Sequence, residues 1–256
     1  MKTARFFAIV VMIMTALFSV NCNAERNYSD NVSTYRDNDS IVTQQRNVGD
    51  FTGVSVHIVG NVNIIVGKPC ELTVSANSKD IDNIKTYVAN GCLVIEYENP
   101  NKKWFKNKSD NNLNINIDVY VESLKAVTAT GCANVKIPDA VAGYELNIIV
   151  SGASVIQFAN VDINGRINAE VSGASTLNIS GSATNVTYKA SGASNINAYD
   201  LNCIVAQTDA SGASTIKASA DQELKAYASG ASTIKYLGKP KVLDIQTSGA
   251  SNVKGE

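Results

Sequence analysis

The amino-acid sequence predicts an all-β fold: a parallel β-helix, or β-solenoid, of about 19–21 residues per coil, preceded by a less regular N-terminal β region. A four-residue motif, most often Ser-Gly-Ala-Ser, recurs at a nearly constant interval through the second half of the chain. A fixed period of this length is typical of a solenoid. The residues between the motifs are rich in Ser, Thr, Asn, Val and Ile, which favours strands over helices.

The glycine of this motif marks each coil. Successive motif glycines are separated by 21, 21, 19, 20, 18 and 19 residues. At about 3.3 Å per residue, this length with its turns fits one coil of a narrow β-helix, in which equivalent residues stack about 4.8 Å apart. The structural repeat glycines are Gly131, Gly152, Gly173, Gly192, Gly212, Gly230 and Gly249.

Alternating polarity continues through the motif. Val171, Gly173, Ser175 and Leu177 share one parity, and we expect this set to point inward because strand side chains alternate between faces. This pattern predicts one long strand through each motif, in which the glycine and the second serine face the interior. The stacked serines are then expected to hydrogen-bond along their column. The apolar core column is expected to contain Ile156, Leu177, Ile196, Ile216, Ile234 and Val253.

Each coil also holds a second predicted strand, bounded by turn residues. These second strands are expected at 185–188, 204–207, 223–226 and 242–245. The region from Phe51 to Val121 contains further β-like runs at 54–58, 61–66, 71–76, 93–97 and 113–121, with a partly helical segment at 81–88. We interpret this region as the wider opening coils of the same solenoid, so that residues 49–256 form a single domain.

Three segments and the repeated motif together point to a known family. The segments are RNVGDFTGVSV at 46–56, NIIVG at 63–67 and VANGCLVI at 88–95. From about Arg46 to Lys254, the chain resembles the putative auto-transporter adhesin, head GIN domain family, whose members are exported proteins found largely in Bacteroidetes. The resemblance implies a right-handed parallel β-helix at the cell envelope with an adhesin function. It carries over no catalytic residues.

Residues 1–24 are typical of a secretory signal peptide. Lys2 and Arg5 precede an apolar run from Phe6 to Val20, and the segment ends in a small residue. The apolar run has 15 residues, fewer than the roughly 20 that span a bilayer. We therefore expect export, with a mature chain from about residue 25 that has no transmembrane segment. Cleavage before Cys22 followed by lipid attachment is the second alternative.

Residues 25–48 are polar and predict a disordered leader. Within the leader, Asp39-Ser40-Ile41 resembles an acceptor pattern for O-glycosylation at Ser40. Four cysteines remain in the mature chain, and four thiols allow three disulfide pairings, among which the sequence does not choose. Their spacings of 22, 40 and 71 residues match no zinc pattern, so no metal site is predicted. These cysteines are Cys70, Cys92, Cys132 and Cys203.

Charge and titratable residues argue against several functions. The chain has 22 basic and 23 acidic residues, and this near-neutral balance argues against nucleic acid as a partner. The single histidine, His57, excludes catalysis that needs two, and we expect it exposed on an outer or edge strand. Glu170 and Asp209 lie two coils apart with Lys189 between them, which favours an alternating-charge ladder over a catalytic pair. We predict no enzyme activity and no cofactor.

The least repetitive segment, Asn99–Asn112, contains the candidate ligand-binding residues. An exposed aromatic pair among cations suits a sugar or an anionic polymer, whereas a hairpin loop with aromatics packed on the solenoid is the alternative. The outward column from Thr176 to Asn252 is flat and polar, and we interpret it as a solvated strand surface rather than a binding site for ice or crystalline glycan. The candidate residues are Trp104, Phe105, Lys102, Lys103 and Lys106.

Together these features favour an exported cell-envelope protein that acts as a non-enzymatic adhesin or structural binding module. The expected partner is a glycan or a host or cell-surface protein. The alternative is a carbohydrate-active enzyme or a glycan-binding module on the same scaffold. The last repeat, Ser248–Glu256, carries no capping helix, so we also predict an end-to-end homodimer that covers the exposed coil.

Overall fold

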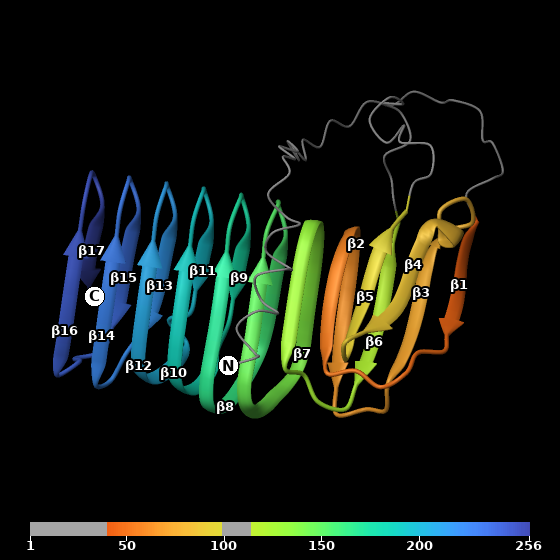
Figure 1. Cartoon of the computed structure of the whole chain (residues 1–256), viewed down its shortest axis with the longest axis horizontal. Coiled ribbons are helices and arrows are strands. Elements are labelled where there is room, and N and C mark those ends of the chain that lie inside the picture. The colour runs from red at the N-terminus through yellow and green to blue at the C-terminus, as the bar shows by residue number, and fades with distance from the viewer. Residues whose placement is uncertain (1–39, 99–113) are drawn as a thin grey trace.

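The structure, a computed structural model, describes residues 40–98 and 114–256. The described residues form one 17-stranded sheet that coils along the molecule. Figure 1 shows the coils side by side in a row from β7 to β17, with β1–β6 grouped at the other end. This arrangement is the β-solenoid that the sequence predicts.

Long strands form one wall of each coil. Each pairs in parallel with its equivalents in the neighbouring coils; Lys189 of β10, for example, pairs with Glu170 of β8 and Asp209 of β12. These strands contain all four of the predicted second-strand segments, which are therefore confirmed. The long strands are β7 (Ala126–Val150), β8 (Val155–Val171), β10 (Gly181–Ala190), β12 (Leu201–Ala210), β14 (Glu223–Ala228) and β16 (Val242–Thr247).

Short strands form the facing wall. Thr176, Asn195 and Thr215 occupy equivalent positions in successive short strands, which again pair in parallel. We call this surface the short-strand wall; it also includes residues 134–137 of β7 and 155–158 of β8, because both strands bend around a corner of the coil. The short strands are β9 (Thr176–Asn178), β11 (Asn195–Asn197), β13 (Thr215–Ser219), β15 (Thr233–Leu237) and β17 (Asn252–Gly255).

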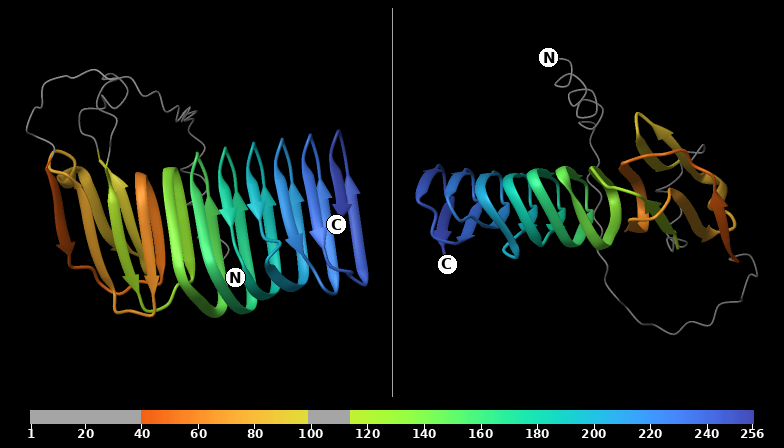
Figure 2. Two further views of the ribbon diagram at one scale, coloured as in Figure 1. Left: turned by 180° about the vertical axis from the view of Figure 1, so that it is seen from behind. Right: turned by 90° about the horizontal axis from the view of Figure 1, so that it is seen from below.

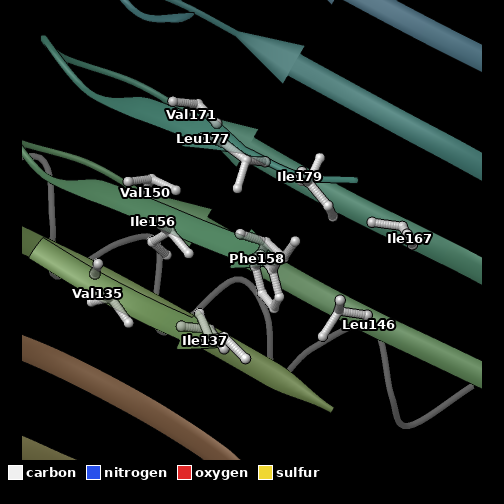
Figure 3. Close-up of a cluster of buried hydrophobic side chains, with 14 of the residues drawn as sticks. Val135, Ile137, Leu146, Val150, Ile156, Phe158, Ile167, Val171, Leu177 and Ile179 are labelled. Carbon is white, nitrogen blue, oxygen red and sulfur yellow. The ribbon is translucent and has the colours of Figure 1, made fainter. Parts of the chain in front are cut away.

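The hydrophobic core lies between the two walls. Figure 3 shows Val171 and Ile167 of the long strand pointing toward Leu177 and Ile179 of the same coil. The predicted core column is confirmed, since Ile156, Leu177, Ile196, Ile216 and Ile234 are each 0% exposed. Burying each such side chain stabilises the fold by about 1.5–3 kcal/mol. Val253 of the last coil is only half-buried.

The Ser-Gly-Ala-Ser motif forms a tight turn, and the prediction of a strand running through it is wrong for most copies. Between β8 and β9, Gly173 adopts a φ of +74° and lies exposed at the turn, where a strand would have placed it inside. The positive φ reverses the chain, which an extended strand cannot do. The turns nevertheless stack directly, because Ala193 N donates to Gly173 O over 2.8 Å and the other copies repeat this bond.

The second serine is buried in five copies of the motif, as predicted, but its hydrogen bonds differ from the prediction; the buried residues are Ser154, Ser175, Ser194, Ser214 and Ser232. Ser194 Oγ donates to Val171 O over 3.0 Å, and Ser232 Oγ donates to Ala210 O over 3.0 Å. The hydroxyls therefore bond to the backbone of the preceding coil instead of to one another. At Ser194 and Ser232 the turn leaves a carbonyl of the long strand within reach of the buried hydroxyl, which satisfies both groups. Ser154 Oγ instead accepts a hydrogen bond from Ala133 N over 3.2 Å.

The N-terminal region contains the predicted strand runs, although the run expected at 113–121 is a strand only from Asn116, and the region is less coil-like than expected. Its strand β2 joins the solenoid by pairing in parallel with β7, whereas β1–β3, β3–β6 and β4–β5 are antiparallel pairs. The β4–β5 hairpin turns at Asn90 and Gly91, which both have a positive φ, as a type I′ turn requires. The orange and yellow N-terminal strands in Figure 2 spread more widely than the green and blue coils.

The elements of this region are short apart from β2. Residues 81–83 form one 3₁₀ turn, so the partly helical segment expected at 81–88 is helical only at its start. The strands are β1 (Ile41–Arg46), β2 (Gly53–Val66), β3 (Glu71–Asn77), β4 (Ile84–Ala89), β5 (Cys92–Tyr97) and β6 (Asn116–Val121).

Strand β1 corrects the predicted extent of the disordered leader. Residues 41–46 pair antiparallel with β3 throughout their length. Arg46 anchors the strand, because its guanidinium donates to Ile81 O over 2.9 Å and to Ile84 O over 2.6 Å. Ser40, the predicted glycosylation site, is exposed just before this strand. The predicted signal peptide and Cys22 lie outside the described residues.

Candidate functional site

The binding residues predicted from the sequence cannot be placed in the fold. Lys102, Lys103, Trp104, Phe105 and Lys106 all lie outside the described residues, in the segment that connects β5 to β6. Their assignment as ligand-binding residues stays a prediction. The described residues instead present a different candidate surface.

This candidate surface is the outside of the short-strand wall, which we call the polar face. The sequence alone led us to interpret its first column as a solvated strand surface. Two columns of outward residues run along it in parallel register. Equivalent residues in each column stack about 4.8 Å apart. The first column contains Asn134, Val155, Thr176, Asn195, Thr215, Thr233 and Asn252. The second contains Lys136, Gln157, Asn178, Asn197, Lys217, Lys235 and Lys254.

A groove of about 390 Å³ lies beside the first half of the second column. Its polar lining includes Gln157, Asn178 and Asn197, whose amides offer both donors and acceptors. Its apolar lining includes Phe158 and Ile179, which belong to the core. The volume falls within the range of about 300–1,000 Å³ that is usual for small-molecule sites.

The groove amides are partly fixed by each other. Asn197 Nδ2 donates to Asn178 Oδ1 over 2.8 Å across one rung. This bond orients both side chains and leaves further donor and acceptor capacity on each amide for a ligand. The charged lining residues, Lys136 and Asp200, have opposite signs.

The other half of the second column is basic. Lys217, Lys235 and Lys254 occupy three successive rungs. One carboxylate is already bound there: Lys235 Nζ lies 2.7 Å from Glu256 Oε1, and Tyr199 OH donates to Glu256 Oε2 over 2.8 Å. Lys217 Nζ lies 5.8 Å from the centre of the Tyr199 ring, within range of a cation–π contact.

These contacts shift two pKa values. The hydrogen bonds from Lys235 and Tyr199 lower the pKa of Glu256, so that its carboxylate stays ionised below the usual range. Burial, followed by the hydrogen bond to Glu256, raises the pKa of Tyr199, so that its hydroxyl remains a donor. The arrangement binds a carboxylate through both of its oxygens.

The charge ladder of the long-strand wall is as predicted. Lys189 stacks between Glu170 and Asp209, and its Nζ lies 3.3 Å from Glu170 Oε1. Both partners are more than half exposed, so water screens the pair and its contribution is small. These residues therefore form a solvated charge ladder.

His57 is half-buried, which corrects the expectation that it is exposed. Its Nε2 lies 2.8 Å from Ser55 Oγ, and its Nδ1 lies 2.8 Å from Thr130 Oγ1. Burial lowers its pKa, opposed by the charge of Glu96 on the adjacent strand. The sequence did not reveal this arrangement because Thr130 lies 73 residues further along the chain and meets His57 only through the β2–β7 pairing.

The cysteines do not form disulfides within the described residues. Burial raises the pKa of Cys92 to about 11 and that of Cys203 to about 12, so neither thiol ionises readily. In the described part of the chain, no group of three or more His, Cys, Asp or Glu residues could hold a metal ion. Nor do residues 40–98 and 114–256 include a helix of the length and apolarity needed to cross a membrane.

Comparisons with known proteins identify the fold and a family match. The family described as putative auto-transporter adhesin, head GIN domain, matches residues 50–240. A solved structure of a putative adhesin from Bacteroides fragilis superposes with a TM-score of 0.76 at 19% identity, covering 85% of this chain and 97% of that one. No curated protein sequence matches the chain.

Two further solved structures share the fold. A putative adhesin from Parabacteroides merdae has a TM-score of 0.60 at 15% identity, with 84% of this chain and 96% of that chain covered. A putative lipid binding protein from Parabacteroides distasonis has a TM-score of 0.58 at 21% identity, with 83% and 96% covered. At these identities the similarity establishes the architecture alone.

Proposed function

We propose that this chain, which belongs to the family described as putative auto-transporter adhesin, head GIN domain, is an exported, non-enzymatic binding module that acts as an adhesin at the cell envelope. The observation that carries the proposal is the polar face, a continuous surface of stacked polar residues along the solenoid. Solenoids of this kind use extended surfaces for binding. A long repetitive surface suits a polymer or a cell surface better than one small substrate.

The chemistry of the described residues supports a non-enzymatic role. Glu170 and Asp209 are separated by two rungs and by the intervening Lys189. Both ring nitrogens of His57 form hydrogen bonds with hydroxyl groups of the sheet, Ser55 Oγ and Thr130 Oγ1. The packing of the strands therefore accounts for the position of this side chain. The signal-peptide pattern of residues 1–24 supports export.

Adhesion is tested with the mature chain, from about residue 25, coupled to beads. We expect the beads to bind whole bacterial or host cells, whereas beads that carry heat-denatured protein do not. The full-length chain, expressed in a Bacteroidetes host, is expected in the envelope fraction, and deletion of residues 1–24 is expected to retain it in the cytoplasm. Beads that bind no cell type, or full-length chain found in the cytoplasm, would contradict the proposal.

The predicted loop site is tested in the same assay. If the segment at 99–112 contacts the partner, Trp104→Ala lowers cell binding because an exposed tryptophan supplies a large contact area. Unchanged binding of the variant would remove the loop from the site.

The predicted end-to-end homodimer has its own support. The outer edge of the last coil exposes Val242, Leu243 and Ile245, which are 53%, 46% and 40% accessible. A second copy that pairs with this edge would cover these side chains and the unpaired backbone groups of β16 and β17. We expect a dimer mass by light scattering at high concentration; a monomer mass there would refute the prediction.

A further inference from the structure

The amide half and the basic half of the polar face form one continuous track. Asn197 at the end of the groove pairs in register with Lys217, which begins the basic half. The short strands β9, β11, β13 and β15, seen side by side in Figure 1, keep this register from rung to rung. A ligand that lies along the solenoid axis therefore contacts the groove amides first and the lysines next.

The amide half fits the neutral part of a sugar chain. Its amides supply paired donors and acceptors for hydroxyl groups. The rung spacing of about 4.8 Å is close to the length of one sugar unit. A peptide strand cannot add to this surface, because each inner short strand is already paired on both sides.

The basic half offers contacts for carboxylates. Three lysines on successive rungs repel one another, which makes an anion between them favourable. The chain itself demonstrates the chemistry, since Glu256 binds Lys235 through one carboxylate oxygen and Tyr199 through the other. The Glu256 side chain thus occupies the position that a ligand carboxylate would take.

From these observations we propose that the polar face binds an extended polysaccharide whose sugar units carry carboxylates. Its hydroxyl groups lie along Gln157, Asn178 and Asn197, and its carboxylates lie on Lys217, Lys235 and Lys254. Glu256 competes for the carboxylate position in the unliganded protein. The proposal rests on the adhesin function and names the chemical class of its partner.

The probe is polygalacturonate, a polymer of uronic acid, and binding is measured by isothermal titration calorimetry on the mature chain at low ionic strength. Lys217→Ala and Lys254→Ala should each weaken binding about threefold or more, because each removes one charge contact. Asn178→Leu should weaken binding without changing its salt dependence. Glu256→Gln should strengthen binding, because the competing carboxylate loses its charge.

Lys225→Ala is the matched control. Lys225 lies on the long-strand wall, is half-buried as Lys217 is, and changes the net charge by the same amount when replaced. If Lys225→Ala weakens binding as much as Lys217→Ala, nonspecific charge attraction explains the binding and the proposal is wrong. If Glu256→Gln leaves the affinity for polygalacturonate unchanged, the proposed competition between Glu256 and the ligand carboxylate is wrong. Melting temperatures confirm that each variant is folded.

Two further probes separate the alternatives. Dextran, a neutral polysaccharide, should bind more weakly than polygalacturonate, and equal binding would remove the role of the lysines. The protein should not bind vesicles that contain phosphatidylglycerol. If it does bind them, and Lys217→Ala abolishes this binding, the polar face binds a membrane instead of a polysaccharide. Cell adhesion without polygalacturonate binding would overturn this inference and leave the adhesin function intact. Absence of both cell adhesion and polygalacturonate binding would overturn both the adhesin function and this inference.

Discussion

At the scale of single residues, the motif glycines satisfy two demands at once. Gly192 has a φ of +74°, which L side chains rarely adopt, and a Cβ at this position would lie 2.8 Å from Gly173 O of the preceding coil. The turn conformation and the stacking of adjacent turns therefore both require the absence of a side chain. Gly143 differs, because a Cβ there would meet no atom within 4 Å and its φ is not positive.

This difference predicts unequal effects of the same substitution. Gly192→Ala should lower the free energy of unfolding by about 1–2 kcal/mol or more from the positive φ alone. Gly143→Ala should change it by no more than about 0.5 kcal/mol, or stabilise slightly. Urea unfolding followed by circular dichroism measures both. If both substitutions changed the free energy of unfolding equally, the turn conformation and the stacking of the turns would not require glycine at position 192.

The titration of His57 predicts a dependence of stability on pH. Burial lowers its pKa in the folded state below the usual value of about 6.5, so the unfolded chain binds the proton more readily. The free energy of unfolding therefore falls as pH decreases from about 6.5 to the folded-state pKa. His57→Gln keeps a polar side chain and removes this titration. Its unfolding free energy should fall less between pH 7.5 and 5 than that of the wild-type chain; identical pH profiles would contradict the prediction.

At the scale of elements, the attachment of β1 depends on one side chain. The Arg46 guanidinium donates to the backbone carbonyls of Ile81, the first residue of the 3₁₀ turn, and Ile84, which follows the turn. Arg46→Met should remove hydrogen bonds from a charged donor, each worth about 1.5–3 kcal/mol. We expect faster hydrogen exchange in β1 and proteolytic cleavage within residues 41–48. Arg166→Met, at an exposed position on β8, is the control and should leave β1 protected.

The solenoid elements could be predicted because each coil repeats the same pattern of strands, turn and inward apolar residues. The columns from Ile156 to Ile234 and from Thr176 to Asn252 follow directly from the period and the alternation of polarity. The motif turn was misassigned because its alternation is also compatible with a strand. Only the φ of the glycine distinguishes the two conformations, and glycine adopts either one readily.

The N-terminal elements were harder to predict because their partners do not repeat. Strand β3 lies between β1 and β6, which precede and follow it at different distances along the chain. Nothing in the local pattern of β1 distinguishes an edge strand from a polar leader, since its alternating burial depends on β3 being present. Its pairing is a tertiary effect.

The candidate site was predicted only in part. The sequence period places Lys217, Lys235 and Lys254 in one column, as the register confirms. The bound carboxylate could not be predicted, because Tyr199 and Glu256 are 57 residues apart and meet across several coils. The groove also depends on the way β7 and β8 bend around the corner of the coil, which the period does not specify.

At the scale of the whole molecule, each coil is stabilised by its two neighbours. Ile216 in β13 is fully buried between flanking coils, whereas Val253 in β17 has a neighbouring coil on one side only in the structure. In such a quasi-one-dimensional fold, stability is the sum of coil and interface terms, so an inner coil contributes two interfaces and the last coil one.

This asymmetry predicts where the molecule opens first. Ile216→Ala should lower the free energy of unfolding by about 2–5 kcal/mol, because it leaves a cavity that the flanking coils hold open. Val253→Ala should cost less than about 1 kcal/mol, since its half-buried side chain loses less contact and the coil relaxes. In the monomer, at protein concentrations too low for the proposed dimer, hydrogen exchange should show the fastest opening in β16 and β17 and the slowest in β10 and β12. Uniform exchange along the solenoid would mean that the coils unfold together, and that the interfaces dominate over the differences between coils.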